Sequence, residues 1–341
     1  MFTQYKIKTH LVENLFRSWE DGFEINLYFL HKNAEISLIV NSINRIAMQN
    51  QKTNFSAGET NPLPSLDEWE EDVLVRYPEG DPAKKSKDEF RNYETPVRDT
   101  VKEFYRLNHK YQTYDFVVQK KNEFLQFNKK EMPVWDAFDF LNQLVDDSDP
   151  DTDLDQFQHL LQTSEAIRRD GHPDWMVLAG LMHDMGKVLC LFGEPQWAVV
   201  GDTFPVGCAY STKIVYPEFF KDNPDFSNPR FNTQFGVYEK GCGLRKVHLS
   251  WGHDEYIYHL MKDYLPEPAL YMLRYHSFYA WHRENEYGYL LDDHDKEMLQ
   301  WVKLFNPYDL YSKSPEPPDI NKLRPYYENL IRKYLPESLK F

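Results

Sequence analysis

The stretch LAGLMHDMGKVLCLFG, residues 178–193, decides the fold of this chain. It is apolar over nearly its whole length, which is typical of a helix buried on all sides, yet His183 and Asp184 lie at its centre. Burying an imidazole beside a carboxylate is costly unless both groups have partners, and a metal ion supplies one. Taken alone, the pair favours a hydrogen-bonded core pair over a metal site.

The sequence on both sides of this stretch contains apolar residues at helical spacing, which indicates further helices. Beyond residue 85, apolar and aromatic side chains recur at the spacing of one helical face. We predict helices over residues 100–121, 134–145, 157–169, 175–192, 255–265, 268–279 and 323–334. Strand-like alternation is scarce, and residues 201–215, rich in Gly, Pro and Thr, are expected to form an irregular loop or short hairpin. The predicted class is all-α, a helical bundle with few or no short strands.

The N-terminal part of the chain has a different composition. Residues 1–50 mix short apolar runs with polar breaks, which do not distinguish helix from strand. Residues 49–87 are rich in Asn, Pro, Glu, Gly, Lys and Ser, as in a linker. We place a domain boundary near residue 85, with an N-terminal extension of unknown role over 1–84 and a second domain over 85–341. Met48, just before the linker, is a second candidate for the start of the chain.

Composition and charge exclude several classes of partner. The net charge of −15 argues against nucleic acid and anionic membrane surfaces, because both require positive potential. The 3 cysteines lack the spacing of a disulfide framework or a zinc site, which indicates a reducing compartment. No run has the length of a membrane span. We therefore expect a cytoplasmic protein without a membrane or nucleic-acid partner, acting on a neutral or cationic small molecule. We also expect a monomer, although none of these features determines the oligomeric state.

Further histidines and an aspartate have the same apolar or aromatic surroundings as the His-Asp pair. They are His159, His253, His276 and Asp309. Four imidazoles and two carboxylates in one core are too many for one tetrahedral zinc ion. They suit two octahedral metal ions that share a bridging carboxylate. Imidazole with carboxylate favours Fe or Mn over Mg, which prefers oxygen ligands.

The other histidines beyond residue 85 are predicted to play no part in this site. Four lie among charged or polar residues and are expected to be solvated: His109, His172, His248 and His294. His259 lies well round its helix from His253, and His282 follows a helix end. Asp254 and Glu255 are either partners of the ligating imidazoles or exposed to solvent. Ferritin-like Glu-x-x-His pairs, phosphate-binding glycine loops and nucleophile elbows are absent from the sequence.

The order His, His-Asp, His, Asp resembles that of the HD-domain superfamily of helical metalloproteins. Longer strings look like the myo-inositol oxygenase family from about Phe90 onward. These strings are GLMHDMGKVL, LFGEPQWAVVGDTFPVGC, LSWGHDEY, RYHSFYAWH, NPYDLYSK and KLRPYY. The resemblance therefore covers about three quarters of the chain and leaves residues 1–84 outside it. It implies an HD-domain-like helical bundle around a di-iron centre, so that residues 85–341 form the catalytic domain.

The resemblance also implies a role for each site residue. One iron would be held by His159, His183 and Asp184, and the other by His253, His276 and Asp309, with Asp184 bridging. Lys187, on the helical face of His183, would be catalytic and would stabilise a substrate alkoxide. The implied substrate contacts are Arg91, Asp146, Lys187, Asp202, His253 and Ser277, with Lys313 nearby.

The implied reaction converts myo-inositol and O2 into D-glucuronate and water. It is a four-electron oxidation that needs no external reductant and starts from a mixed-valent Fe(II)/Fe(III) pair. Two other readings stay open on the residues alone. An HD phosphohydrolase would use the same metal ligands but needs several basic groups, and only Lys187, Arg168 and Arg169 are candidates. An inactive iron-binding or sensor protein is the third.

Overall fold

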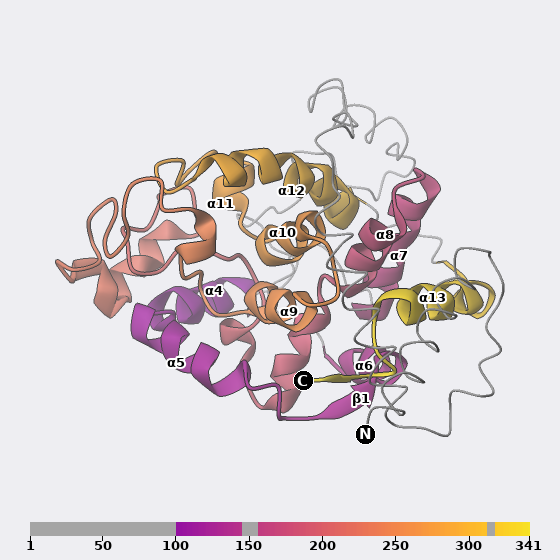
Figure 1. Cartoon of the computed structure of the whole chain (residues 1–341). Helices are drawn as coiled ribbons and strands as arrows, with labels where there is room; N and C mark the ends of the chain where they lie inside the picture. Colours follow the sequence, from indigo (N-terminus) through magenta and orange to yellow (C-terminus); the bar gives the residue numbers. More distant parts are fainter. Residues whose placement is uncertain (1–99, 145–155, 312–317) are drawn as a thin grey trace, which may run out of the picture. The chain divides into compact units, whose positions relative to one another are not determined.

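The computed structural model describes residues 100–144, 156–311 and 318–341 (Figure 1). The predicted extension over residues 1–84 and the boundary near residue 85 lie outside these ranges and stay predictions. Three of the residues assigned near the substrate also lie outside them: Arg91, Asp146 and Lys313.

The described chain is built from helices, which confirms the all-α prediction (Figure 1). The α-helices are α4 (Thr100–Tyr111), α5 (Tyr114–Phe124), α6 (Val134–Leu141), α7 (Gln156–Arg169), α8 (Asp174–Met182), α9 (His253–Met261), α10 (Glu267–Tyr275), α11 (Tyr279–His282), α12 (Asp293–Tyr311) and α13 (Ile320–Tyr334). Short 3₁₀ helices connect them: η3 (Met185–Phe192), η4 (Gln196–Ala198), η5 (Pro217–Asp222), η6 (Pro224–Ser227) and η7 (Leu244–Lys246).

One small antiparallel sheet joins strand β1 (Glu131–Pro133) to strand β2 (Ser338–Lys340). Met132 pairs with Leu339 at its centre, and both side chains are buried. The backbone N–H groups of Lys129 and Lys130 donate to the carbonyl of Phe341 at 2.7 and 3.1 Å. The last residue of the chain is thereby fixed in the core beside β1 (Figure 1).

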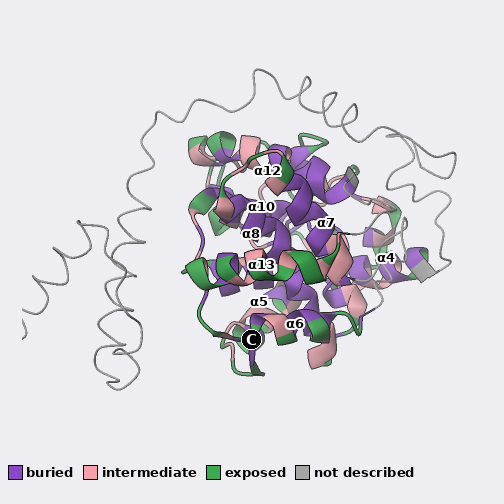
Figure 2. Cartoon of the chain, turned by 90° about the vertical axis from the view of Figure 1, so that its right-hand side faces the viewer, coloured by how far each residue is buried: buried purple, intermediate pink, exposed green. Residues whose placement is uncertain are grey.

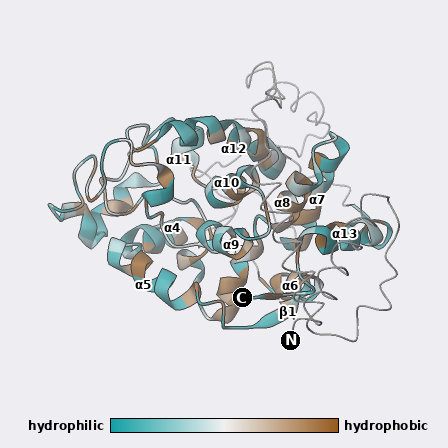
Figure 3. Cartoon of the chain, in the orientation of Figure 1, coloured by the Kyte–Doolittle hydropathy of each residue, from teal (hydrophilic) through white to brown (hydrophobic). Residues whose placement is uncertain are grey.

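Helix α8 forms the centre of the core. Helices α7, α10 and α13 pack against it, and every residue from Trp175 to Met182 is buried (Figure 2). The prediction that no run has the length of a membrane span is wrong by composition alone, because residues 174–192 are long and apolar enough to cross a membrane. Most of this segment is buried inside the protein. The outer helices α12 and α13 carry more hydrophilic residues (Figure 3). The apolar stretch is therefore explained by its central place in the core.

The helix predicted over residues 175–192 changes character at the His-Asp pair. The α-helix ends at Met182, and the chain continues from Met185 as the tighter 3₁₀ helix η3. Asp184 has φ −94° and ψ 0°, which lies outside the α-helical region. Apolar periodicity cannot show this change, because the segment is apolar on all sides. At this junction the side chains of His183 and Asp184 therefore do not point in the directions that two adjacent residues of one regular α-helix would have.

Helix α12 was not predicted from the sequence. Its first turn is acidic, with Asp293 and Asp295, and Pro307 lies inside it. An internal proline is typical of a helix end, so Pro307 concealed this helix in the sequence, although its acidic first turn is a signal of a helix start. The loop prediction over residues 201–215 is consistent with the structure, which has irregular backbone there and a single isolated bridge, Pro205 to Leu249.

The prediction that His109 is solvated is wrong. Its ring is fully buried and stacks on Phe220 with centroids 4.1 Å apart. Its Nε2 lies 2.6 Å from the carbonyl oxygen of Val215, so Nε2 carries the proton and donates. Burial lowers the pKa of His109 to about 4, so the ring is neutral at pH 7.

The helix predicted over residues 100–121 is divided in two by Gln112 and Thr113. Thr113 caps α5, because its side chain accepts from the N–H of Phe116. The buried Gln112 amide donates to the carbonyl of Trp251 at 2.7 Å and accepts from the N–H of Trp251 at 2.9 Å. Trp251 lies two residues before His253, so this pair of bonds fixes the approach to α9.

We expect Gln112→Ala to lower the free energy of unfolding by about 2 to 4 kcal/mol, because it leaves the buried N–H and carbonyl of Trp251 without partners. Urea unfolding followed by circular dichroism measures this change. The control is Gln126→Ala, since Gln126 is exposed and should change stability by less than about 0.5 kcal/mol. Equal effects of the two substitutions would contradict the structural role assigned to Gln112.

Candidate metal centre

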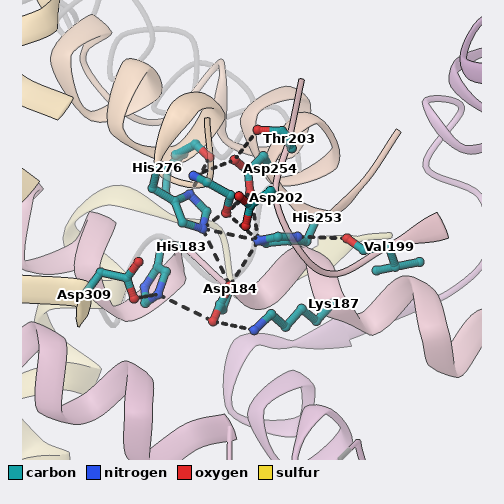
Figure 4. A network of polar contacts seen from close by, with 12 residues as sticks. His183, Asp184, Lys187, Val199, Asp202, Thr203, His253, Asp254, His276 and Asp309 are labelled. Atoms are coloured by element: carbon teal, nitrogen blue, oxygen red, sulfur yellow. Dashed lines mark hydrogen bonds and ion pairs between the residues drawn. The ribbon is translucent and has the colours of Figure 1, made fainter. Parts of the chain in front are cut away.

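The helical packing brings the six predicted metal ligands into one place, and Figure 4 labels five of them, all except His159. Each comes from an element whose position depends on packing against the others. His159 lies on α7, His183 and Asp184 at the junction of α8 and η3, His253 at the start of α9, His276 at the end of α10, and Asp309 in the last turn of α12. All are buried except His159, which is mostly buried.

The first group of donor atoms gathers around Asp309. Its Oδ1 lies 2.9 Å from His159 Nε2 and 3.3 Å from His183 Nε2. The two imidazole nitrogens are 3.3 Å apart. Oδ2 of Asp184 lies 3.7 Å from His159 Nε2 and 3.5 Å from His183 Nε2. These atoms of His159, His183, Asp309 and Asp184 are called the first group below.

The second group lies on the other side of Asp184. Its Oδ1 is 3.3 Å from His253 Nε2 and 3.6 Å from His276 Nε2, and these two nitrogens are 3.3 Å apart. Asp184 therefore presents one carboxylate oxygen to each group (Figure 4). That is the arrangement of a carboxylate that bridges two metal ions.

Asp309 belongs to a different group from the one expected. The resemblance implies that Asp309 binds the metal of His253 and His276, whereas the structure places its Oδ1 against His159 and His183. Helix α12 packs against both α7 and α10, and its last turn carries Asp309 to the α7 side. The order of residues along the chain does not contain this information.

The imidazole rings are oriented as metal ligands. The Nδ1 atoms of His183, His253 and His276 lie 2.8, 2.8 and 3.0 Å from the carbonyl oxygens of residues 180, 199 and 273. A carbonyl only accepts, so each Nδ1 carries the proton, and each neutral ring presents a lone pair at Nε2. When both rings are neutral, the facing lone pairs of His253 and His276 repel each other unless a cation lies between them, so the arrangement suits a metal ion.

The charges of the site also suit a cation. Burial alone would raise the pKa of Asp184, but Lys187 and His183 outweigh it and hold this pKa well below its usual range. Burial likewise opposes ionisation of Asp309, and His183 and His159 hold its pKa well below the usual range. Both carboxylates are ionised. Donors on one metal ion with bonds near 2.1 Å lie roughly 3 Å apart, so the separations fit two metal ions.

At His253 a proton takes the place of the metal ion when no metal is bound. Burial acts to lower its pKa, but the carboxylates of Asp254 and Asp184 outweigh burial and raise it to about 9. A proton therefore occupies Nε2 in the metal-free protein at pH 7. Metal binding to this ring releases that proton.

Lys187 points at the bridging carboxylate. Its Nζ lies 2.8 Å from Oδ2 of Asp184, and its side chain is almost completely buried (Figure 4). Residue spacing alone predicts that Lys187 lies one α-helical turn after His183. The tighter turn of η3 instead places it over Asp184, three residues before it. The ammonium group thus belongs to the metal site.

Two of the predicted substrate contacts lie beside the second group. The Ser277 hydroxyl is 3.3 Å from His253 Nε2. Asp202 is buried and accepts from the Tyr105 hydroxyl at 3.1 Å, and it lies in the same polar network (Figure 4). Both are placed where a ligand of the second group would be in reach.

The structure decides the place of Asp254, which the sequence left open. This carboxylate is fully buried, and its Oδ1 lies 2.7 Å from His253 Nε2. It accepts from the backbone N–H and the hydroxyl of Ser277, both at 3.1 Å. Asp254 therefore fixes Ser277 relative to the second group. Its position directly after a ligating histidine was the signal in the sequence, but helix periodicity does not place adjacent residues on one face.

Comparison with known proteins gives a consistent result. A family model described as myo-inositol oxygenase matches residues 98–341. A probable inositol oxygenase of Oryza sativa subsp. japonica is 52% identical over 261 residues, 74% of this chain and 85% of the relative. The inositol oxygenase of Rattus norvegicus is 50% identical, covering 79% of this chain and 96% of the relative. That of Dictyostelium discoideum is 48% identical, covering 75% and 90%.

We expect Gly186→Ala to damage the second group. A Cβ atom at Gly186 would lie 2.7 Å from the Cα of His253, a backbone atom that cannot move without shifting the start of α9. Stability should fall by about 1 to 3 kcal/mol, and less metal should bind. Urea unfolding and metal analysis measure both. Gly288→Ala is the control, because no atom lies within 4 Å of its added Cβ. Normal stability and metal content in Gly186→Ala would contradict this close packing.

Proposed function

Since the chain belongs to the myo-inositol oxygenase family, we propose that it uses two iron ions to open the ring of myo-inositol with O2, giving D-glucuronate and water. The first iron would be held by His159, His183 and Asp309, and the second by His253 and His276. Asp184 would bridge them. This assignment is based on the distances between donor atoms. It replaces the one implied by the resemblance, in which Asp309 binds the second iron.

The observation that carries the proposal is the position of Asp184. One buried carboxylate faces two imidazoles on each side, through different oxygens. Such a set binds a pair of metal ions about one carboxylate apart, and its mixture of imidazole and carboxylate suits iron better than magnesium. When bound, iron supplies the electron transfer to O2 and lowers the pKa of a coordinated hydroxyl.

The remaining groups suit a neutral polyol. Lys187 is almost buried and holds a positive charge 2.8 Å from Asp184, so it can stabilise negative charge on a substrate oxygen. Ser277, fixed by Asp254, and Asp202 can exchange hydrogen bonds with further hydroxyls. Arg91 and Asp146 stay proposed substrate contacts on the strength of the resemblance.

We also propose that the protein acts as a monomer in the cytoplasm. All six proposed ligands come from one chain, so the site needs no residue from a second copy. The three cysteines are free in the structure, as expected in a reducing compartment.

The described residues give little support to a phosphohydrolase. Two nitrogens of Arg168 donate to Glu165 at 2.7 Å each, and Arg169 is exposed. Lys187 forms an ion pair with Asp184. A phosphate ester would need several free cations at the metals, and neither of these arginines supplies one.

Oxygen uptake by iron-loaded protein tests the proposed function. With myo-inositol, O2 consumed and D-glucuronate formed should be equal, without reductant beyond that needed to set the mixed-valent state. Protein stripped by a chelator should be inactive, and Fe²⁺ but not Mg²⁺ should restore activity. Protein that holds two iron ions and consumes no O2 would refute the proposal, and phosphate release from nucleotides would then be measured without O2.

Replacing the buried ammonium separates metal binding from turnover. Lys187→Ala should retain iron and lose most of its activity, by roughly 100-fold or more, because the charge that stabilises the substrate oxygen is gone. Iron content by metal analysis and O2 uptake give the two readouts. Lys296→Ala, which removes an exposed lysine paired within its own helix, is the control. Normal inositol oxidation by Lys187→Ala would show that this lysine has no catalytic role.

A further inference from the structure

We propose that the buried ion pair between Glu255 and Arg274 is a positioning device that holds His253 and His276 at the separation needed for the second metal ion. The inference rests on the proposed function, since it takes both histidines as ligands. Neither Glu255 nor Arg274 contacts the metal groups. Their effect on the site would act through the two helices that carry the ligands.

The ion pair is bidentate and completely buried. Nε of Arg274 donates to Oε2 of Glu255 at 2.8 Å, and a terminal nitrogen donates to Oε1 at 3.2 Å. The planar guanidinium and the carboxylate thus lie in a fixed mutual orientation. Arg274 also donates to the Tyr275 hydroxyl at 2.9 Å and to the Val247 carbonyl at 3.3 Å. Its side chain has little freedom to rotate.

Glu255 is fixed from several directions. Its Oε1 also accepts from Lys121 Nζ at 2.8 Å and from His259 Nε2 at 3.0 Å. Lys121 lies on α5 and His259 on the next turn of α9. The carboxylate is therefore surrounded by donors and provides a rigid anchor for Arg274.

The two residues of the ion pair lie close to the two histidine ligands along helices α9 and α10. Glu255 follows His253 by two residues on α9, and Arg274 precedes His276 by two residues on α10. Residues two apart project from nearly opposite sides of an α-helix. Helices α9 and α10 pack against each other. The metal joins them through the histidines on one side of their contact, and the ion pair joins them on the other.

Two attachments on opposite sides prevent the helices from rolling against each other. A rolling motion would change the 3.3 Å separation of the Nε2 atoms of His253 and His276. Metal–ligand distances tolerate deviations of only about 0.2 Å, so a small roll costs affinity. None of the ligands of the first group lies on α9 or α10, since they come from α7, the α8–η3 junction and α12. We therefore expect the ion pair to act mainly on the second group.

Fe²⁺ binding to the full-length protein without O2 tests the proposal. The variants are Glu255→Gln, which removes the charge at similar volume, and Arg274→Lys, which keeps the charge but not the fork of donors. Equilibrium dialysis with iron counted per chain should show the first ion bound as in the unaltered protein. The second should bind about 10 to 100 times more weakly. Circular dichroism at the dialysis temperature selects the variants that are folded.

Glu194→Gln is the matched control. Glu194 is a buried glutamate 2.7 Å from Lys120, but this pair does not join α9 to α10, so both iron ions should bind normally. Arg274→Lys decides the question if Glu255→Gln does not fold. Unchanged binding of the second ion, or equal weakening of both ions, would overturn the proposal. If the unaltered protein binds two iron ions but does not oxidise inositol, the proposed function is refuted. The iron-binding results of the variants then still decide this inference.

Discussion

The buried carboxylate of Asp184 is the constraint on which the rest of the structure depends. It is ionised inside the core, and four imidazole nitrogens face its two oxygens. A buried carboxylate destabilises a fold unless positive charge lies beside it. The core is thus organised around positive charge. Lys187 supplies one part of it, and the proposed metal ions supply the rest.

The surrounding helices can be understood as the means of holding these groups against their mutual repulsion. Helix α8 brings His183 and Asp184 into the centre, and the tighter η3 turn directs Lys187 back over the carboxylate. Backbone carbonyls fix three of the four rings through Nδ1. The Glu255–Arg274 pair would add the same rigidity between helices. Such a site requires that whole helices, and not only single side chains, be fixed relative to one another.

A large part of the fold and site could be predicted from the sequence. Helical periodicity around the apolar stretch gave the fold class and most of the helices, because burial selects side chains at the spacing of a helix. It failed at α12, where Pro307 resembles a helix break, and at His109, whose charged and polar neighbours concealed a buried ring stacked on Phe220. In both cases packing outweighed local composition.

The sequence by itself determined which residues form the site. The His-Asp pair in an apolar segment, and further histidines and an aspartate in similar surroundings, select six groups without any knowledge of their positions. Only the tertiary structure decided how they are divided, with Asp309 beside His159 and His183, and that Asp254 and Glu255 are buried. The physical reason is that residue spacing fixes directions within one helix. The distances between helices are set by how their side chains pack.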